Sequence, residues 1–261
     1  MSRILSLVLR TALPLSLLGT ITVVGLPDVS MAQQFVPPDR GLPGRREGGG
    51  TRGSCLRGQV PLTALMPASN FAQTTKTSPT FFWYVPPFLA ETAEFVLLDE
   101  HDNELYHTTV QLVEDGGVVS LSLPTVKDAS GTDVSLLNEG QDYHWYFSLI
   151  CDPDDRSGDV FAEGWIQRVQ PTLALTNRLA IARTEREQAA VYAEAGIWHD
   201  ALTTLAELRR SQPSNSALLS NWITLLESVD LENIASEPII SCCEPVPSEQ
   251  STIPSEQSLV P

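Results

Sequence analysis

The sequence predicts a β + α protein in which an antiparallel β-sandwich is followed by a small α-helical domain. Between residues 80 and 169, short runs rich in β-branched and aromatic residues alternate with Pro, Gly, Asn and Asp, as strands alternate with turns. After Pro171 the apolar residues recur every three or four positions, which is the spacing of an amphipathic helix. A length of 261 residues accommodates both parts. We therefore place the sandwich at residues 58–170 and the helical domain at residues 171–240.

Residues 1–32 have the organisation of a cleavable signal peptide. Arg3 and Arg10 make the start of the chain basic, and an apolar segment follows over residues 11–26. Ser30 and Ala32 place small residues where signal peptidase requires them. The alternative is an uncleaved membrane anchor, for which the apolar segment is short and interrupted by a proline. We therefore expect a periplasmic or extracellular protein whose mature chain has no transmembrane segment.

The chain is strongly acidic, with 32 Asp and Glu residues against 16 Lys and Arg and a formal net charge of −16. Such a charge repels polyanions, so the composition excludes nucleic-acid binding as a function class. Residues 33–57 form a Gly/Arg-rich exception, which we interpret as a flexible linker. The alternative is an arm that docks on an acidic surface of a partner or of this protein. Residues 241–261 contain PSEQS twice and are predicted to be disordered.

Six strands are predicted within the sandwich, with residues 59–66 as a candidate seventh. The six lie at residues 80–85, 94–99, 104–112, 117–123, 142–150 and 159–169. Leu137, Gly140 and Tyr143 have the spacing of a tyrosine corner, in which a Tyr hydroxyl bonds back to the chain just upstream. With this motif, residues 58–170 resemble immunoglobulin and fibronectin type III sandwiches.

The four cysteines, Cys55, Cys151, Cys242 and Cys243, form an even set in a chain that is predicted to be exported. An oxidising compartment favours disulfide bonds over metal or catalytic thiols, and four cysteines allow three pairings. The resemblance to an immunoglobulin-like sandwich implies that Cys55 pairs with Cys151. In that strand order the start of the first strand and the end of the penultimate strand lie at the same end of the sandwich.

The helical domain contains one segment that resembles a tetratricopeptide repeat. Thr184 and Glu187 form a capping box, which marks a helix start, and a further helix is predicted at residues 216–228. The stretch AVYAEAGIWHDALTTLAELRRSQPSN has the small and bulky positions of the repeat but lacks its usual Trp-x-x-Leu-Gly start. A lone repeat must pack on the sandwich or on a partner to bury its apolar side.

In tetratricopeptide proteins the first helix of each repeat presents the face that binds peptides. The resemblance therefore implies that a protein partner binds to a face formed by Arg186, Ala190, Ala193 and Glu194. The alternative is that these residues form an ordinary solvated helix face.

Two acidic loops are candidate calcium ligands. In an immunoglobulin-like strand order, the loop at residues 99–103 and the loop at residues 152–159 lie at the same end of the sandwich. Carboxylate oxygens are the ligands that Ca²⁺ prefers, although the spacing in the second loop does not match an EF-hand. The candidate metal ligands are Asp99, Asp102, Asp152, Asp154, Asp155 and Asp159. The alternative is that both are solvated hairpin loops.

No arrangement of residues in the sequence predicts catalysis. The four histidines form no HExxH-type pair, and there is no G-x-S-x-G nucleophile motif. We therefore predict that the protein is not an enzyme and has no cofactor. The five tryptophans fall in amphipathic patterns and are predicted to be packing residues, with an aromatic carbohydrate-binding platform as the alternative.

Several long segments together resemble a cyanobacterial family of exported proteins known as domain of unknown function 928. They are RREGGGTRGSC, TFFWYVP, AEFVLLDE, YHWYFSLICDPDDRSGDVFAEGWIQRV and AEAGIWHDALTTLAELRR. The resemblance covers nearly all of residues 40–243 and implies no catalytic residue. We expect a non-enzymatic interaction or assembly protein of the cell envelope that binds a protein partner through its helical domain. The alternative is a calcium-dependent or carbohydrate-binding surface module that uses the loop end of the sandwich.

Overall fold

The computed structural model describes residues 34–48, 55, 59–87, 92–112, 116–128 and 130–240. All of these residues belong to one compact unit of the chain. The predicted signal peptide, part of the Gly/Arg-rich segment and the predicted disordered tail lie outside the described residues.

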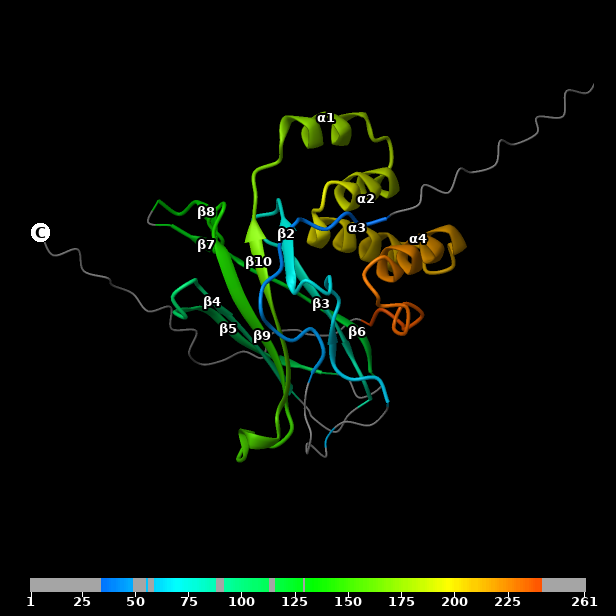
Figure 1. Cartoon of the computed structure of the whole chain (residues 1–261). Coiled ribbons are helices and arrows are strands. Elements are labelled where there is room, and N and C mark those ends of the chain that lie inside the picture. The colour runs from blue at the N-terminus through cyan, green and yellow to red at the C-terminus, as the bar shows by residue number, and fades with distance from the viewer. Residues whose placement is uncertain are drawn as a thin grey trace, which may run out of the picture. The chain divides into compact units, whose positions relative to one another are not determined.

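Strands precede helices along the described part of the chain, in the β + α order that the sequence predicts (Figure 1). The strands are β1 (Thr63–Ala64), β2 (Phe71–Thr74), β3 (Thr80–Val85), β4 (Thr92–Leu98), β5 (Glu104–Gln111), β6 (Gly117–Ser122), β7 (Thr125–Lys127), β8 (Asp133–Ser135), β9 (Asp142–Ile150) and β10 (Val160–Arg168). A short 3-10 helix, η1, spans Arg156–Gly158. The helices are α1 (Leu173–Ile181), α2 (Glu185–Glu194), α3 (Trp198–Ser211) and α4 (Ser216–Glu227). None of these helices combines the length and the apolar character that a membrane crossing requires.

The strands form two larger sheets and a small ribbon. One sheet has the order β1-β3-β6, the second has the order β2-β10-β9-β4-β5, and β7 pairs with β8. Every strand pair is antiparallel except β2 with β10, which is parallel. The prediction of a wholly antiparallel sandwich is therefore wrong at this edge. After β1 the chain crosses from the first sheet to the second, so that β2 runs in the same direction as β10.

The two larger sheets share an aromatic core. Trp83 of β3 stacks on Phe147 of β9 with ring centroids 4.0 Å apart, and its edge meets Trp145 at 5.8 Å. Phe81 of β3 lies 5.0 Å from Phe95 of β4. All five rings are at most 2% exposed. Residues two apart on one strand thus point to the same buried side, as the alternation in the sequence predicts.

The predicted tyrosine corner is present before β9. The backbone amide of Asn138 donates a hydrogen bond of 2.8 Å to the hydroxyl of Tyr143, which in turn lies 3.0 Å from the side-chain oxygen of Gln141. These bonds fix the chain where it enters the central strand of the second sheet.

We predict that Tyr143→Phe lowers the free energy of unfolding by about 1–2 kcal/mol, because a part-buried amide loses its acceptor. Chemical denaturation followed by tryptophan fluorescence measures this loss. Tyr106→Phe is the matched control, since the Tyr106 hydroxyl bonds to no described residue. Equal stability of the two variants would contradict a structural role for the corner.

The helices pack on the sheets through the start of α3. The indole nitrogen of Trp198 donates to the backbone oxygen of Leu65 at 2.8 Å, and Trp198 is fully buried. The Asp200 carboxylate accepts a hydrogen bond of 2.6 Å from the hydroxyl of Thr74 at the end of β2. The start of α3 is therefore buried against the protein's own sheets.

Residues 34–48 form an arm that joins the helices to the sheets. Phe35 is buried, and its ring meets Trp198 edge-on with centroids 4.9 Å apart. The backbone amide of Val36 donates to the backbone oxygen of Ala193 at the end of α2, over 3.1 Å. This part of the arm therefore covers the turn between α2 and α3 (Figure 1).

The rest of the arm runs onto the second sheet. The indole nitrogen of Trp165 on β10 donates to the backbone oxygen of Pro43 over 2.8 Å. The guanidinium of Arg46 donates to the backbone oxygen of Val229, just after α4, over 2.6 Å. The prediction of a flexible linker is wrong for residues 34–48, because they bond to this protein's own helices and sheets. Backbone hydrogen bonds hold the arm, although composition alone indicates a linker.

Candidate partner-binding surface on the helices

The helix α1 begins and ends at clear local signals. The hydroxyl of Thr172 accepts a hydrogen bond of 3.1 Å from the backbone amide of Leu175, which caps the start of the helix. Ala182 ends it, and Thr184 then caps α2 through the predicted capping box with Glu187. The connection between the two helices is so short that α1 and α2 must lie side by side.

α1 leaves most of its apolar side chains uncovered. Among its residues only Leu175 is buried. Leu173 is 76% exposed and Ile181 is 77% exposed, the highest values for any large apolar side chain in the described part of the chain. Two large apolar side chains therefore face solvent on the helix at the outer end of the helical part. Figure 1 shows α1 at this outer end, beyond α2.

A shallow groove of about 260 Å³ lies between α1 and α2. Its lining residues are Arg178, Ile181, Ala182, Glu187 and Val191. Ile181 and Val191 supply an apolar floor, and one cation and one carboxylate supply a polar rim. We call this groove together with Leu173 the α1–α2 surface. An apolar centre with a polar rim is the composition of a protein–protein contact.

The predicted partner-binding face on α2 is largely covered within this chain. Ala190 is 1% exposed and Ala193 is fully buried. Glu194 forms an ion pair with Arg178 of α1, and Arg186 is half-buried. The prediction is wrong for the two alanines, because α1 and the arm pack where a peptide would have to bind. The exposed apolar surface lies one helix further out, on α1.

α1 was not predicted, because the capping box at Thr184 indicates a first helix that starts there. A signal was present in the sequence: Pro171 and Thr172 precede three leucines at residues 173, 175 and 179. That pattern lacks a Glu at the third helical position and therefore has no capping box. The capping box at Thr184 was the stronger signal, and the first helix was predicted to start there.

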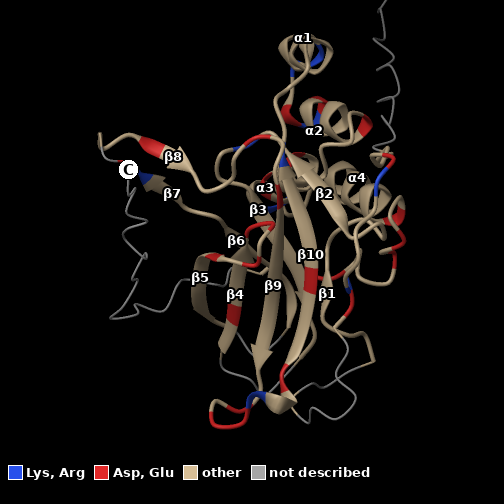
Figure 2. Cartoon of the chain, turned by 60° about the vertical axis from the view of Figure 1, so that its left-hand side comes forward, with Lys and Arg blue, Asp and Glu red and all other residues tan. Residues whose placement is uncertain are grey.

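The two acidic loops lie at opposite ends of the second sheet, so the predicted calcium site is wrong. In the pairing of β4 with β9, Leu98 lies opposite His144 and Thr92 lies opposite Ile150. The loop after β4 is therefore at one end of the strands and the loop after β9 is at the other (Figure 2). About 20 Å of strand separates them. The residues concerned are Asp99, Asp102, Asp152, Asp154, Asp155 and Asp159.

Several of these carboxylates bond within their own turns. Asp99 accepts hydrogen bonds from the side-chain amide of Asn103 and from the backbone amides of Asn103 and His101, which holds the pKa of its carboxyl below the usual value. Asp155 caps η1 by accepting from the backbone amide of Ser157. In the described part of the chain, no group of three or more His, Cys, Asp or Glu residues is arranged to hold a metal ion.

The predicted disulfide between Cys55 and Cys151 is present, with 5.4 Å between the two Cα atoms. It joins the segment before β1 to the end of β9. Cys242 and Cys243 lie outside the described residues.

The tryptophans are packing residues, as predicted. Four of them, Trp83, Trp145, Trp198 and Trp222, are at most 2% exposed. Trp165 stacks on His144 with ring centroids 4.3 Å apart and is partly covered by the arm. Four of the five rings are thus too buried to form a carbohydrate platform, and Trp165 has one ring face covered by His144.

A comparison with protein families supports the resemblance drawn from the sequence. The model of the family described as Domain of Unknown Function (DUF928) matches residues 47–239. No curated protein matches the chain in a sequence search. The matched residues include every strand and helix of the structure, and on this evidence the chain belongs to the DUF928 family.

Proposed function

We propose that this protein is a non-enzymatic interaction or assembly protein of the cell envelope, and that a protein partner binds to its α1–α2 surface. The observation that carries the proposal is the exposure of two large apolar side chains on α1: Ile181, which lines the groove, and Leu173 at the other end of the helix. Burial of two such side chains contributes about 3–6 kcal/mol, which is enough to decide whether a complex forms.

The arrangement of the elements supports a binding role. The orders β1-β3-β6 and β2-β10-β9-β4-β5, together with the tyrosine corner, favour an immunoglobulin-like sandwich. The four consecutive helices favour a short tetratricopeptide-like array. Both are scaffolds that commonly present binding surfaces.

The Cys55–Cys151 disulfide supports export. Such bonds persist in oxidising compartments, which agrees with the signal peptide that residues 1–32 predict. We therefore place the protein in the periplasm or outside the cell.

The partner that this surface fits is a helix with an apolar stripe. α1 packs on α2 as one member of a helical array, and an incoming helix would pack on α1 in the same manner. Arg178 and Glu187 at the rim would bond to polar residues that flank the stripe.

We predict that Leu173→Asp/Ile181→Asp reduces recovery of the partner at least tenfold, because two apolar contacts are lost. The measurement is cross-linking in cells with a tagged full chain, followed by quantitative mass spectrometry. The variant should melt at the wild-type temperature, because both side chains are exposed in the free protein.

The matched control is Leu219→Asp, which places a charge on an exposed position of α4. We expect this control to retain the partner. A partner recovered equally with wild type, control and double variant would contradict a role for the α1–α2 surface. Recovery of polysaccharide without any protein would contradict the proposed function itself.

A further inference from the structure

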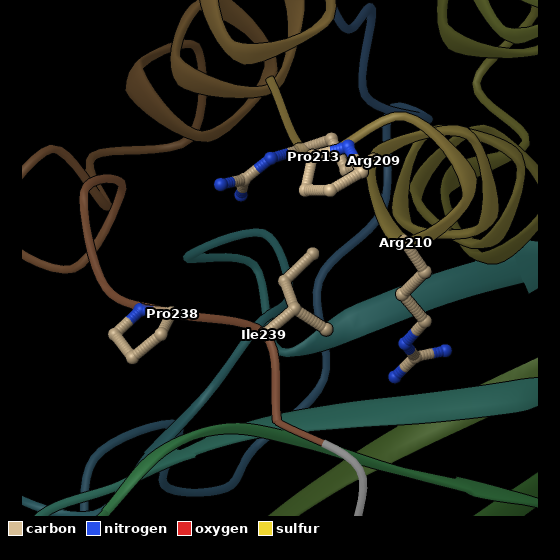
Figure 3. A pocket seen from close by; sticks show the side chains of 5 residues that line it. All are labelled: Arg209, Arg210, Pro213, Pro238 and Ile239. Carbon is tan, nitrogen blue, oxygen red and sulfur yellow. The ribbon is translucent and has the colours of Figure 1, made fainter. Parts of the chain in front are cut away.

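A second, separate cavity lies at the end of α3. Its volume is about 370 Å³, and its lining residues are Arg209, Arg210, Pro213, Pro238 and Ile239. Figure 3 shows Ile239 projecting into this pocket between the two arginine side chains. Two cations therefore border one pocket in a chain that carries twice as many acidic as basic residues. We call it the arginine pocket.

Stacking on aromatic rings holds both guanidinium groups in place. The Arg209 guanidinium lies 5.2 Å from the ring centre of Trp222 on α4, and that of Arg210 lies 5.9 Å from Phe82 on β3. Arg210 also donates a hydrogen bond of 2.8 Å to the hydroxyl of Ser120 on β6. A guanidinium held by its face keeps its N–H edge available for an anion.

Neither guanidinium has a carboxylate within ion-pair distance among the described residues, although Glu207, which precedes Arg210 by three residues on α3, acts on Arg210 from further away. Other arginines of this part of the chain do have one, such as Arg40 with Asp142 and Arg156 with Glu94. One nitrogen of Arg209, Nη1, is buried and has no hydrogen-bond partner among the described residues. Burial lowers the pKa of both arginines, and the charge of Glu207 offsets only part of this effect at Arg210. An anion in the pocket would remove this penalty.

The end of the described chain leads out of the pocket. The backbone amide of Val118 on β6 donates to Pro238 over 2.8 Å, and that of Ile240 donates to Val118 over 2.9 Å. These two bonds fix Pro238 and Ile239 as pocket walls, and the chain continues from there into residues 241–261. That segment contains Glu244, Glu249 and Glu256 and has no Lys or Arg.

The segment is long enough to reach the arginines. Glu244 is four residues beyond Ile240, which corresponds to about 13 Å of extended chain. Because the segment is covalently attached at the pocket wall, its effective concentration there is of the order of millimolar. A weak charge-assisted bond is then sufficient for substantial occupancy.

We propose that residues 241–261 dock in the arginine pocket of the same chain, with glutamate carboxylates bonded to Arg209 and Arg210. The nearest ligand is Glu244. This contact is independent of the α1–α2 surface, because it lies on the other side of α3 and involves neither α1 nor α2.

Proteolysis of the tail tests the proposal in the full chain. A glutamate-specific endopeptidase cleaves after Glu249, and docking of the segment slows this cleavage. We expect Arg209→Gln/Arg210→Gln to be cleaved about fivefold faster than wild type, the effect of losing two partly exposed ion pairs. Salt at about 0.5 M should bring the two rates together by screening.

Three further variants keep the experiment decisive. Lys127→Gln/Arg183→Gln removes the same charge elsewhere and should be cleaved at the wild-type rate, and Arg209→Lys/Arg210→Lys should keep most of the protection. If the first variant melts early because Arg209 no longer stacks on Trp222, the exposed Arg210→Gln alone is expected to give about a twofold effect. Equal cleavage rates for wild type and the folded Arg→Gln variants would overturn the proposal. The arginines would then serve only to pack α3 against its neighbours.

Discussion

Removing the disulfide, as Cys55→Ser/Cys151→Ser, is expected to lower the free energy of unfolding by about 4 kcal/mol. The two cysteines are 96 positions apart, so the bond closes a long loop in the unfolded chain and restricts it strongly. Typical domains have only about 5–15 kcal/mol of stability, so a loss of this size populates the unfolded state at physiological temperature. Urea denaturation of the oxidised wild type and the double variant measures the difference.

The control for this prediction is Cys242→Ser/Cys243→Ser, which leaves the long loop closed. We expect its unfolding free energy to match that of wild type within about 1 kcal/mol. Peptide mapping of the non-reduced protein provides a second check. A peptide that links Cys151 to Cys242 or Cys243 would contradict both the pairing and the stability difference.

Local sequence signals predicted most of the sheets. The predicted runs at residues 80–85 and 142–150 coincide with β3 and β9, because both strands are rich in aromatic residues and bounded by Pro, Gly or Asp. The tyrosine corner was identified from three residues, because its hydrogen bond joins groups only five positions apart. Features that depend on residues close together in the chain could thus be predicted from the sequence.

Contacts between segments far apart in the chain could not be predicted from the sequence. β2 has only four residues and lacks the alternation of apolar and polar residues that marks a strand. It forms a strand because it pairs in parallel with β10 at the edge of the sheet. The arm has the Gly and Arg content of a linker, yet its backbone bonds to residues more than a hundred positions away, such as Trp165. In both cases the partner, and not the segment's own composition, determines the structure.

The candidate site shows the same division. The capping box at Thr184 and the spacing of the apolar residues located α2 and α3 correctly, but the side chains on α2 that a peptide would contact were assigned as though α1 were absent. The calcium prediction assumed an immunoglobulin-like strand order, in which the loop at residues 99–103 and the loop at residues 152–159 lie at the same end of the sandwich. The register of β4 with β9 places the two loops apart, and no local feature of either loop reveals that register.

The joint between helices and sheets contains a buried histidine with an unusual pKa. His199, the second residue of α3, is 4% exposed, and its Nδ1 lies 3.1 Å from the backbone oxygen of Thr80. The carbonyl can only accept, so Nδ1 carries the proton of the neutral ring. Burial among apolar groups, including the ring of Phe81 at 5.1 Å, lowers the pKa of His199 from 6.5 to about 4.

The sign of the resulting pH dependence follows from which state binds the proton. Between pH 6.5 and about 4 the unfolded histidine is protonated whereas the folded one is neutral, so unfolding takes up a proton. The contribution to stability is complete above pH 6.5 and is lost as the pH falls toward 4. The difference between the two pKa values corresponds to about 3 kcal/mol.

Neighbouring groups modify this dependence, so the test needs a difference between variants. Burial raises the pKa of Asp200, whose contribution is present at low pH and is lost as the pH rises through its folded value. Asp200 therefore offsets part of the acid effect. Burial also lowers the pKa of His144, which adds to the acid effect.

We predict that His199→Gln removes about 3 kcal/mol of the stability that wild type loses between about pH 7.5 and pH 4. A glutamine amide retains a donor for Thr80 but has no proton to gain, so the variant should be less stable than wild type at high pH and lose less on acidification. Urea denaturation at both pH values gives the difference. His101→Gln, at an exposed turn, should show the full wild-type loss, and parallel pH curves for wild type and His199→Gln would show that the buried imidazole does not couple the helix–sheet joint to pH.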